Sequence, residues 1–259
     1  MEPWEHWQPE PELLRDRVIL VTGAGDGIGK ACARSFAAHG ATVILLGRTI
    51  RKLEAVYDEI EQAGHPQPAI YPLDLEGATV KHYGELAATV EREFGRLDGL
   101  LHNAALLGGL TPMTHYEAML WYQVLQINLN APFLLTHACL PLLMRTDEAS
   151  VVFTSDRVGR KARAYWGAYA VSKFGLEALM QILADETEVN TRLRFNSVDP
   201  GPVRTPMRAL AYPGEDPRTL AQPEDVVKPF LYLMSPASEG ITGQQFSAQR
   251  TETPAPAAD

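Results

Sequence analysis

Short, almost wholly apolar runs alternate along this chain with longer stretches in which apolar residues recur every three or four positions. The short runs predict strands that are buried on both faces, and the longer stretches predict amphipathic helices. The expected strands lie at 17–22, 41–46, 69–73, 97–102, 150–154, 194–198 and 241–246. The expected helices are one that ends at about residue 39, followed by 50–63, 79–94, 116–144, 166–190 and 224–234. Strands alternating with helices of this length predict a parallel sheet with right-handed crossovers.

The alternating pattern occupies one block of the chain, which indicates a single domain at 17–249. Residues 1–16 are acidic and proline-rich and are expected to form an arm, which Trp4 and Trp7 anchor either to the domain or to another subunit. Residues 202–222 belong to a proline-rich stretch and are expected to form an irregular lid over the substrate. Residues 250–259 have the composition of a disordered tail.

Composition narrows the range of partners. Apolar residues make up 46% of the 259 residues, enough for a sizeable core, and the net charge of −9 argues against nucleic acid or an anionic membrane as the main partner. No stretch approaches the roughly 20 apolar residues that span a bilayer. The arm also lacks the apolar segment of a secretory signal, so a cytoplasmic location is expected, and no metal site is predicted.

A glycine-rich loop, TGAGDGIG at 22–29, joins the first strand to the first helix. Its glycines, Gly23, Gly27 and Gly29, would let the backbone approach a pyrophosphate, and the following helix N-terminus would offer free N–H groups. An ordinary tight turn between strand and helix is the alternative.

The loop resembles the signature loop of the short-chain dehydrogenase/reductase family, and the similarity extends over nearly the whole chain. The resemblance implies a doubly wound Rossmann fold of the α/β class, with a seven-stranded parallel sheet in the order 3-2-1-4-5-6-7 and helices on both faces.

The end of the second strand bears on the choice of cofactor. Dinucleotide folds that prefer NAD place a carboxylate there, but this chain has Arg48, which could bind the 2′-phosphate of NADP. NADP(H) is therefore expected over NAD(H). Asp26 opposes this, because many NADP-using relatives carry a basic residue at its position, and Arg48 could instead be a solvated residue at a helix start.

The resemblance assigns further cofactor contacts to short segments that follow the strands. Asp74 matches the residue that binds the adenine edge, although an aspartate at a strand exit is also a common turn residue. Asn103 and Ala104 match a segment that lies against the ribose, and Thr205 is the expected hydroxyl contact to the nicotinamide carboxamide. The other expected cofactor contacts are Asp26, Ile28, Leu75, Pro200, Gly201 and Val203.

Tyr169 and Lys173 lie four residues apart in the segment YAVSK, within a helix pattern, so that they share one helix face. A lysine beside a phenol lowers its pKa and allows proton exchange with an alcohol oxygen. A YxxxK pair alone would more often be an exposed surface pair, but here it follows the glycine loop at the spacing of the family. Asn128 matches the asparagine that helps to hold the lysine and a water, and Asn130 is the competing candidate.

One position departs from the family. The catalytic serine is expected thirteen residues before the tyrosine, where this chain has Asp156, and its neighbour Ser155 should point to the opposite side of the strand. An ionised Asp156 donates no hydrogen bond and would disfavour a phenolate at Tyr169. Three possibilities would make this position compatible with catalysis: neutralisation of Asp156 by Arg157 or Lys161, protonation of Asp156 in a dry pocket, or a local shift that brings Ser155 inward.

Two functions follow from these motifs. The first is an NAD(P)-dependent oxidoreductase that transfers hydride between the nicotinamide and a carbonyl or alcohol. The second is a dinucleotide-binding sensor or scaffold that has lost turnover because of Asp156. Residues 106–113, Trp166 and 207–212 predict a mostly apolar pocket for a small molecule, and segments such as TSDRVGRKARAYWGAYAVSKFG are similar to those of a bacterial subgroup, the YciK-like oxidoreductases. The resemblance also implies a homodimer or homotetramer that pairs the helices at 116–144 and 166–190.

Overall fold

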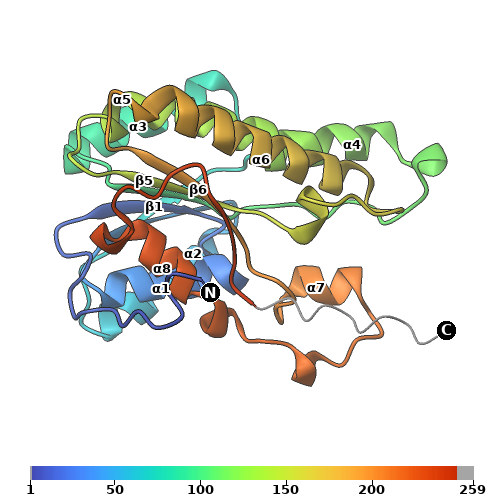
Figure 1. Ribbon diagram of the computed structural model, residues 1–259, viewed down its shortest axis with the longest axis horizontal. Helices are drawn as coiled ribbons and strands as arrows, with labels where there is room; N and C mark the ends of the chain where they lie inside the picture. The colour runs from blue at the N-terminus through green and yellow to red at the C-terminus, as the bar shows by residue number, and fades with distance from the viewer. Residues whose placement is uncertain (1, 250–259) are drawn as a thin grey trace.

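The computed structural model describes residues 2–249, and within them a single parallel sheet organises the chain (Figure 1). The seven strands lie in the order β3-β2-β1-β4-β5-β6-β7 and all pairs are parallel. This confirms the predicted fold class and strand order. The strands are β1 (Val18–Thr22), β2 (Thr42–Gly47), β3 (Ala69–Pro72), β4 (Gly99–His102), β5 (Ser150–Thr154), β6 (Arg194–Asp199) and β7 (Gln245–Ser247).

Helices cover both faces of the sheet (Figure 1). One face carries α1 (Gly27–Ala38), α2 (Ile50–Gln62) and α8 (Lys228–Met234), and the other carries α3 (Val80–Phe94), α4 (Ala118–Leu125), α5 (Ala131–Leu143) and α6 (Gly167–Glu188). A short helix, α7 (Pro206–Ala211), stands apart from both layers beyond one end of the sheet (Figure 1). Short 3-10 turns lie at Met113–His115, Arg157–Gly159, Pro217–Thr219, Pro223–Val226 and Pro236–Ser238.

Successive side chains of the central strands pack alternately into two hydrophobic cores, one on each face of the sheet. In β1, Ile19 and Val21 pack with α1, α2 and α8, whereas Val18 and Leu20 pack with the helices of the other face. Both sets are buried because successive side chains of a strand point to opposite faces. Burial on both faces is why the strands are continuous apolar runs in the sequence.

The helix predicted at 116–144 is not one regular helix. It begins at Ala118 and contains a π-helical turn at Gln126–Asn130 between α4 and α5. Pro132 lies two residues after this turn. A proline inside a helix has no N–H to donate, and its ring crowds the carbonyl four residues earlier, here that of Asn128. The widened turn relieves this crowding, and Asn128 lies within it.

Three more segments differ from the expected pattern. The 202–222 stretch is not wholly irregular, because Thr205 caps α7 by accepting a hydrogen bond from the Arg208 N–H at 3.2 Å. The last strand covers only 245–247 rather than 241–246, because Gly243 has φ of +69° and breaks the extended chain. The helix expected at 224–234 divides into the 3-10 turn Pro223–Val226 and α8.

The N-terminal arm packs against its own domain. Trp4 is buried and meets the ring of Phe246 edge-on at a centroid distance of 5.0 Å, and Trp7 meets the ring of Tyr232 at 5.2 Å. The two tryptophans therefore hold the arm on α8 and β7. The predicted tail at 250–259 lies outside the described residues.

Candidate active site

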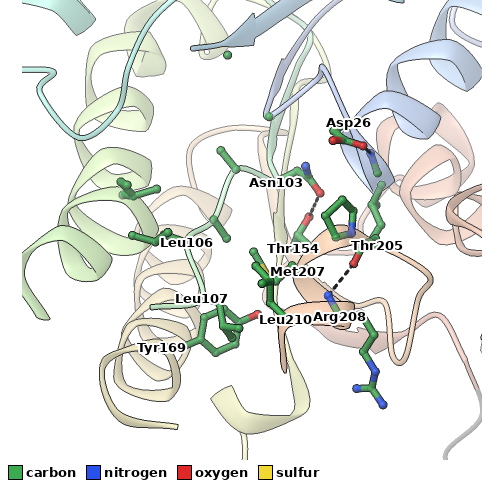
Figure 2. Close-up of a pocket in the computed structure, with 18 of the residues that line it drawn as sticks. Asp26, Asn103, Leu106, Leu107, Thr154, Tyr169, Thr205, Met207, Arg208 and Leu210 are labelled. Atoms are coloured by element: carbon green, nitrogen blue, oxygen red, sulfur yellow. Dashed lines mark hydrogen bonds between the residues drawn. The ribbon is translucent and has the colours of Figure 1, made fainter. Parts of the chain in front are cut away.

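A cavity of about 680 Å³ opens at the carboxyl ends of the strands, where the chain order reverses between β1 and β4. Ligands of open α/β sheets bind at such a switch point. The glycine loop and Arg48 line one part of the cavity, and Asp156, Tyr169 and Lys173 line another. Figure 2 shows Asp26, Asn103, Thr205 and Tyr169 around this single space.

The glycine loop brings bare backbone to the cavity. A Cβ on Gly29 would lie 2.3 Å from the Gly23 carbonyl oxygen and 2.5 Å from the Asn103 amide nitrogen, so only glycine fits there. Gly23 and Gly27 have φ of +66° and +50°, which other residues rarely adopt. Asp26 caps α1 through the Gly27 N–H at 2.8 Å, and the helix N-terminus faces the cavity. This arrangement fits a pyrophosphate, because the loop offers backbone N–H groups and a favourable dipole.

Thr22 fixes the loop to the neighbouring strand, a role that the sequence analysis missed. Its hydroxyl donates to the Leu101 carbonyl at 3.2 Å and accepts from the N–H groups of Asn103 and Ala104 at 2.9 and 3.1 Å. The Asn103 side chain in turn accepts from the Thr154 hydroxyl at 3.4 Å (Figure 2). The ends of β1, β4 and β5 are thereby joined under the floor of the cavity.

A second cation lies beside Arg48, which the sequence analysis also missed. Lys52 stands in the first turn of α2, lines the same cavity, and forms an ion pair with Asp26 at 2.5 Å. Hydrogen bonding from Lys52 lowers the pKa of the Asp26 carboxyl. Asp26, which argued against a phosphate at this position, is thus already paired with a cation. Arg48 precedes α2, so its spacing from Lys52 is not a helical one; the signal in the sequence is a second basic residue in the first turn of the helix that follows Arg48.

The remaining expected cofactor contacts gather around the same space. Asp74 and Leu75 line the cavity after β3, where the Asp74 carboxylate accepts from the Glu76 N–H at 3.2 Å. On the other side Gly201 has φ of +70° and donates to Asp199 at 2.8 Å. Gln249, which was not predicted, donates to the carbonyls of Pro200 and Pro202 at 2.8 and 2.9 Å and fixes this turn. Ile28, Ala104, Val203 and Thr205 also line the cavity.

Tyr169 and Lys173 lie on α6, as predicted, with the lysine nitrogen 5.6 Å from the centre of the tyrosine ring. The ammonium group donates to the Thr154 carbonyl at 2.6 Å, and the Tyr169 hydroxyl donates to Asp156 at 3.2 Å. The pKa of the phenol is not lowered as the lysine spacing predicted: burial, and then the charge of Asp156, raise it well above its usual value. Burial lowers the pKa of Lys173 to about 8.

Ser155 and Asp156 point to opposite sides, as strand alternation predicts. The Ser155 hydroxyl donates to Glu177 at 2.5 Å, and Glu177 also accepts from Ser197 at 2.7 Å and Arg160 at 3.3 Å. Ser155 is therefore engaged in a buried network behind the site, and the inward shift considered above has not occurred.

Asp156 sits at the edge of the cavity as the cap of a 3-10 turn. One carboxylate oxygen accepts from the Val158 N–H at 2.9 Å and the other accepts from the Tyr169 hydroxyl. Within residues 2–249 its side chain accepts from the Val158 N–H and the Tyr169 hydroxyl and forms no ion pair with Arg157 or Lys161, so the first of the three possibilities, neutralisation by these residues, is not observed.

Asn128 is buried in the π-helical turn and does not line the cavity. Its amide accepts from the Leu106 N–H at 2.7 Å and donates to the Leu106 carbonyl at 2.9 Å and to the Ser172 hydroxyl at 3.1 Å. Asn128 therefore ties the loop after β4 to α6, the helix that carries the tyrosine. The competing Asn130 is exposed, and its side chain donates to that of Gln126 at 3.1 Å.

The end of the cavity near Tyr169 is mostly apolar and aromatic. Figure 2 shows Leu107, Met207 and Leu210 around the tyrosine. The Trp166 ring lies 5.7 Å from that of Tyr169. Arg208 reaches this end too, and its Nε and one of its two terminal nitrogens donate to Glu215, each at 2.6 Å.

Comparison with known proteins agrees with this geometry. The sequence model of the short chain dehydrogenase family matches residues 17–216. The chain belongs to this family. It is an NAD(P)-dependent oxidoreductase, as the glycine loop and the Tyr169–Lys173 pair predicted, and the short-chain dehydrogenase resemblance is confirmed.

Individual relatives are similar over nearly the full length. The oxidoreductase YciK of Escherichia coli K12 is 49% identical over 249 residues, which cover 96% of this chain and 98% of YciK. Two solved short-chain dehydrogenases, from Shigella flexneri 2a in complex with NADP and from Escherichia coli CFT073 in complex with NADPH, are each 49% identical. Both have a TM-score of 0.91, and the match covers 93% of this chain and all of each neighbour. Among the described residues, no helix is long and apolar enough to span a membrane.

Proposed function

We propose that this dehydrogenase uses NADP(H) in preference to NAD(H) and interconverts a small, largely apolar carbonyl compound with its alcohol. The observation that carries the proposal is one cavity with two unlike ends. At one end, Arg48 and Lys52 follow β2, where they could bind a 2′-phosphate. At the other, mostly apolar end lie Tyr169 and Lys173. The two solved relatives with NADP and NADPH support the same cofactor.

Different residues of the cavity would bind the cofactor and transfer the proton during carbonyl reduction. The reduced nicotinamide, when bound, supplies a hydride to the carbonyl carbon. The glycine loop would hold the pyrophosphate, and the turn at Pro200–Thr205 would lie beside the nicotinamide. Tyr169 holds its proton because its pKa is raised, so it can donate that proton to the substrate oxygen. Lys173, fixed by the Thr154 carbonyl, would stabilise the phenolate left behind.

Asp156 sets the main limit on this reaction. In the family this position supplies a hydrogen-bond donor to the substrate oxygen, whereas an ionised carboxylate only accepts. Loss of one such donor costs about 10²–10³ in turnover. We therefore expect slow reduction of plain ketones. The alternative of a sensor without turnover rests on Asp156 alone, and no other feature of the site favours it.

The test compares the wild type with Tyr169→Phe on a panel of small apolar ketones and aldehydes, following NADPH oxidation. Removal of the proton donor should lower kcat by about 10²–10⁴, while the Kd for NADPH, measured by fluorescence titration, stays unchanged. The matched control is Tyr57→Phe, since Tyr57 lies on α2 outside the cavity. Tight NADPH binding without turnover of any substrate, by the wild type and by Asp156→Ser alike, would favour the sensor.

A further inference from the structure

The hydrogen bonding of Asp156 must change when a substrate binds. Its outer oxygen is satisfied only by the Tyr169 hydroxyl among the described residues, at 3.2 Å. The same hydroxyl must turn to the substrate oxygen to deliver its proton. The outer oxygen of Asp156, which lies in a mostly apolar cavity, would then be left without a hydrogen-bond donor, and an unpaired buried acceptor costs free energy. A plain ketone brings only acceptors and cannot repair the loss.

The charges around the site favour a positively charged replacement donor. Asp156 and Asp199 both bring negative charge to the phenol, and the Lys173 ammonium group donates to the Thr154 carbonyl rather than to either carboxylate. Two nearby guanidinium groups form ion pairs with other carboxylates, Arg208 with Glu215 and Arg160 with Glu177. Arg157 acts on Asp199 by its charge, but within residues 2–249 it forms no ion pair with Asp156. Trp166 lines the same space and offers an aromatic ring next to Tyr169, and such rings attract cations.

We propose that Asp156 selects carbonyl substrates that carry a hydrogen-bond donor, an ammonium group above all, on the carbon next to the carbonyl. The substrate class is then the α-amino ketones and, more weakly, the α-hydroxy ketones, with 1,2-amino alcohols and 1,2-diols as the reduced forms. In this arrangement Tyr169 donates to the carbonyl oxygen while the substrate's own N–H or O–H donates to Asp156. The inference rests on the carbonyl reduction proposed above.

The reaction balances with the cofactor that the family already uses. Hydride addition breaks the C=O π bond and sends its electron pair to oxygen, where the proton of Tyr169 forms the new O–H bond. Water restores the proton of the phenol, and the ammonium group keeps all of its protons. The carboxylate, which repels a developing alkoxide, is neutralised in place by the adjacent ammonium.

Three ketones of nearly equal shape test the proposal: propiophenone, 2-hydroxy-1-phenylethanone and 2-amino-1-phenylethanone. On the carbon next to the carbonyl they carry a methyl, a hydroxyl and an ammonium group, respectively. With NADPH at pH 6.5, kcat/KM of the wild type should rise in that order. A charge-assisted hydrogen bond corresponds to about 10- to 150-fold between the methyl and ammonium compounds. Asp156→Ser should abolish this ratio or reverse it, and Asp156→Asn should reduce it.

Binding provides a readout that does not depend on turnover. Calorimetry on the protein with NADP⁺ should show that 2-amino-1-phenylethanol binds more tightly than 1-phenylpropan-1-ol, with the preference lost in Asp156→Ser. Asp216→Asn is the matched control, since Asp216 also caps a 3-10 turn but lies outside the cavity, and it should leave both preferences unchanged.

The outcomes separate the two proposals. Equal preferences in the wild type and Asp156→Ser, or a wild type that prefers propiophenone, would overturn the role of Asp156 while leaving carbonyl reduction intact. If NADPH binds but no ketone is reduced by any variant, carbonyl reduction is wrong, and the calorimetry alone then decides whether Asp156 binds an ammonium. Equal binding of the two alcohols in that case would overturn the inference as well.

Discussion

Ser155 and Asp156 are neighbours, but the extended backbone after β5 turns one side chain to Glu177 and the other to the Tyr169 hydroxyl. The family's serine donates to the substrate at the second of these positions, so Ser155 cannot take over the task without a twist of the strand. The chemistry of the site therefore depends on whether a carboxylate or a donor occupies one position.

We predict that Asp156→Ser reduces a plain ketone such as propiophenone about 10²–10³-fold faster than the wild type at neutral pH, because it restores one donor to the substrate oxygen. The Kd for NADPH should stay nearly the same, since the substitution lies at the substrate end of the cavity. Steady-state kinetics and a cofactor titration on both proteins provide the check. A faster wild type would mean that another residue, not position 156, serves the substrate oxygen.

Lys173 makes stability depend on pH in a defined window. Burial lowers its pKa to about 8 from an unfolded value of 10.5, so between these pH values the unfolded chain holds a proton that the folded chain has lost. Its contribution therefore destabilises the fold fully below about pH 8 and less as pH rises toward 10.5, by up to about 3 kcal/mol.

The comparison with Lys173→Met isolates this effect. Urea unfolding of both proteins at pH 7, 8, 9 and 10 should show the methionine variant gaining most over the wild type at pH 7, with the difference shrinking above pH 8. A difference in the free energy of unfolding that stays constant across this range would show that the ammonium is not desolvated.

At the scale of elements, α2 brings two cations to the place where a cofactor phosphate would lie. Arg48 lies just before α2 and Lys52 in its first turn, and both line the cavity. A charge-assisted hydrogen bond to a 2′-phosphate is worth about 1.5–3 kcal/mol, or about 10- to 150-fold in affinity. We predict that Arg48→Ala and Lys52→Ala each lower the preference for NADPH over NADH by about this factor.

Affinities for the two cofactors, measured by titration, test the prediction. Arg51→Ala is the control, because Arg51 lies between the two cations on the exposed side of α2 and does not line the cavity. An unchanged ratio in Lys52→Ala would show that Lys52 serves only Asp26. Equal affinities of the wild type for both cofactors would contradict the NADP preference as a whole.

Periodicity predicted the layers well because burial dominates there. Every strand from β1 to β6 was placed within two residues at each end, since buried parallel strands are continuous apolar runs. It failed where a single residue changes the backbone: before Pro132, where the helix widens, and at Gly243, where the last strand is delayed.

Candidate site residues were predictable where they belong to local motifs, such as the glycine loop or Tyr169 and Lys173 on one helix face. The contacts that hold them were not. Glu177 reaches Ser155 from 22 residues away, and Lys52 reaches Asp26 from 26 residues away. Such pairs depend on how helices pack across the sheet, which no spacing in the sequence reveals.

At the scale of the whole molecule, the outer surface of α4, α5 and α6 is unusually apolar for a surface in contact with water. Phe133, Phe174 and Ile182 are 48%, 41% and 54% exposed, and Met119, Tyr122 and Val171 are exposed on the same three helices. The helices lie side by side on one face of the sheet (Figure 1). Large apolar side chains exposed together on neighbouring helices typically mark an interface.

We therefore predict a homodimer or homotetramer that buries this surface around a two-fold axis, where the same patch of two copies meets. Light scattering at micromolar concentration should give a mass of at least twice 28.5 kDa. Phe174→Glu should shift the protein toward the monomer, because a stable interface of roughly 800 Å² per partner tolerates a buried unpaired charge poorly. Ile50→Glu is the matched control, since Ile50 is 51% exposed at the start of α2, on the opposite face of the sheet. A monomeric wild type, or an equal effect of both substitutions, would contradict this interface. Loss of assembly in Phe174→Glu alone, with the fold intact by circular dichroism, would locate it on the helix that also carries Tyr169 and Lys173.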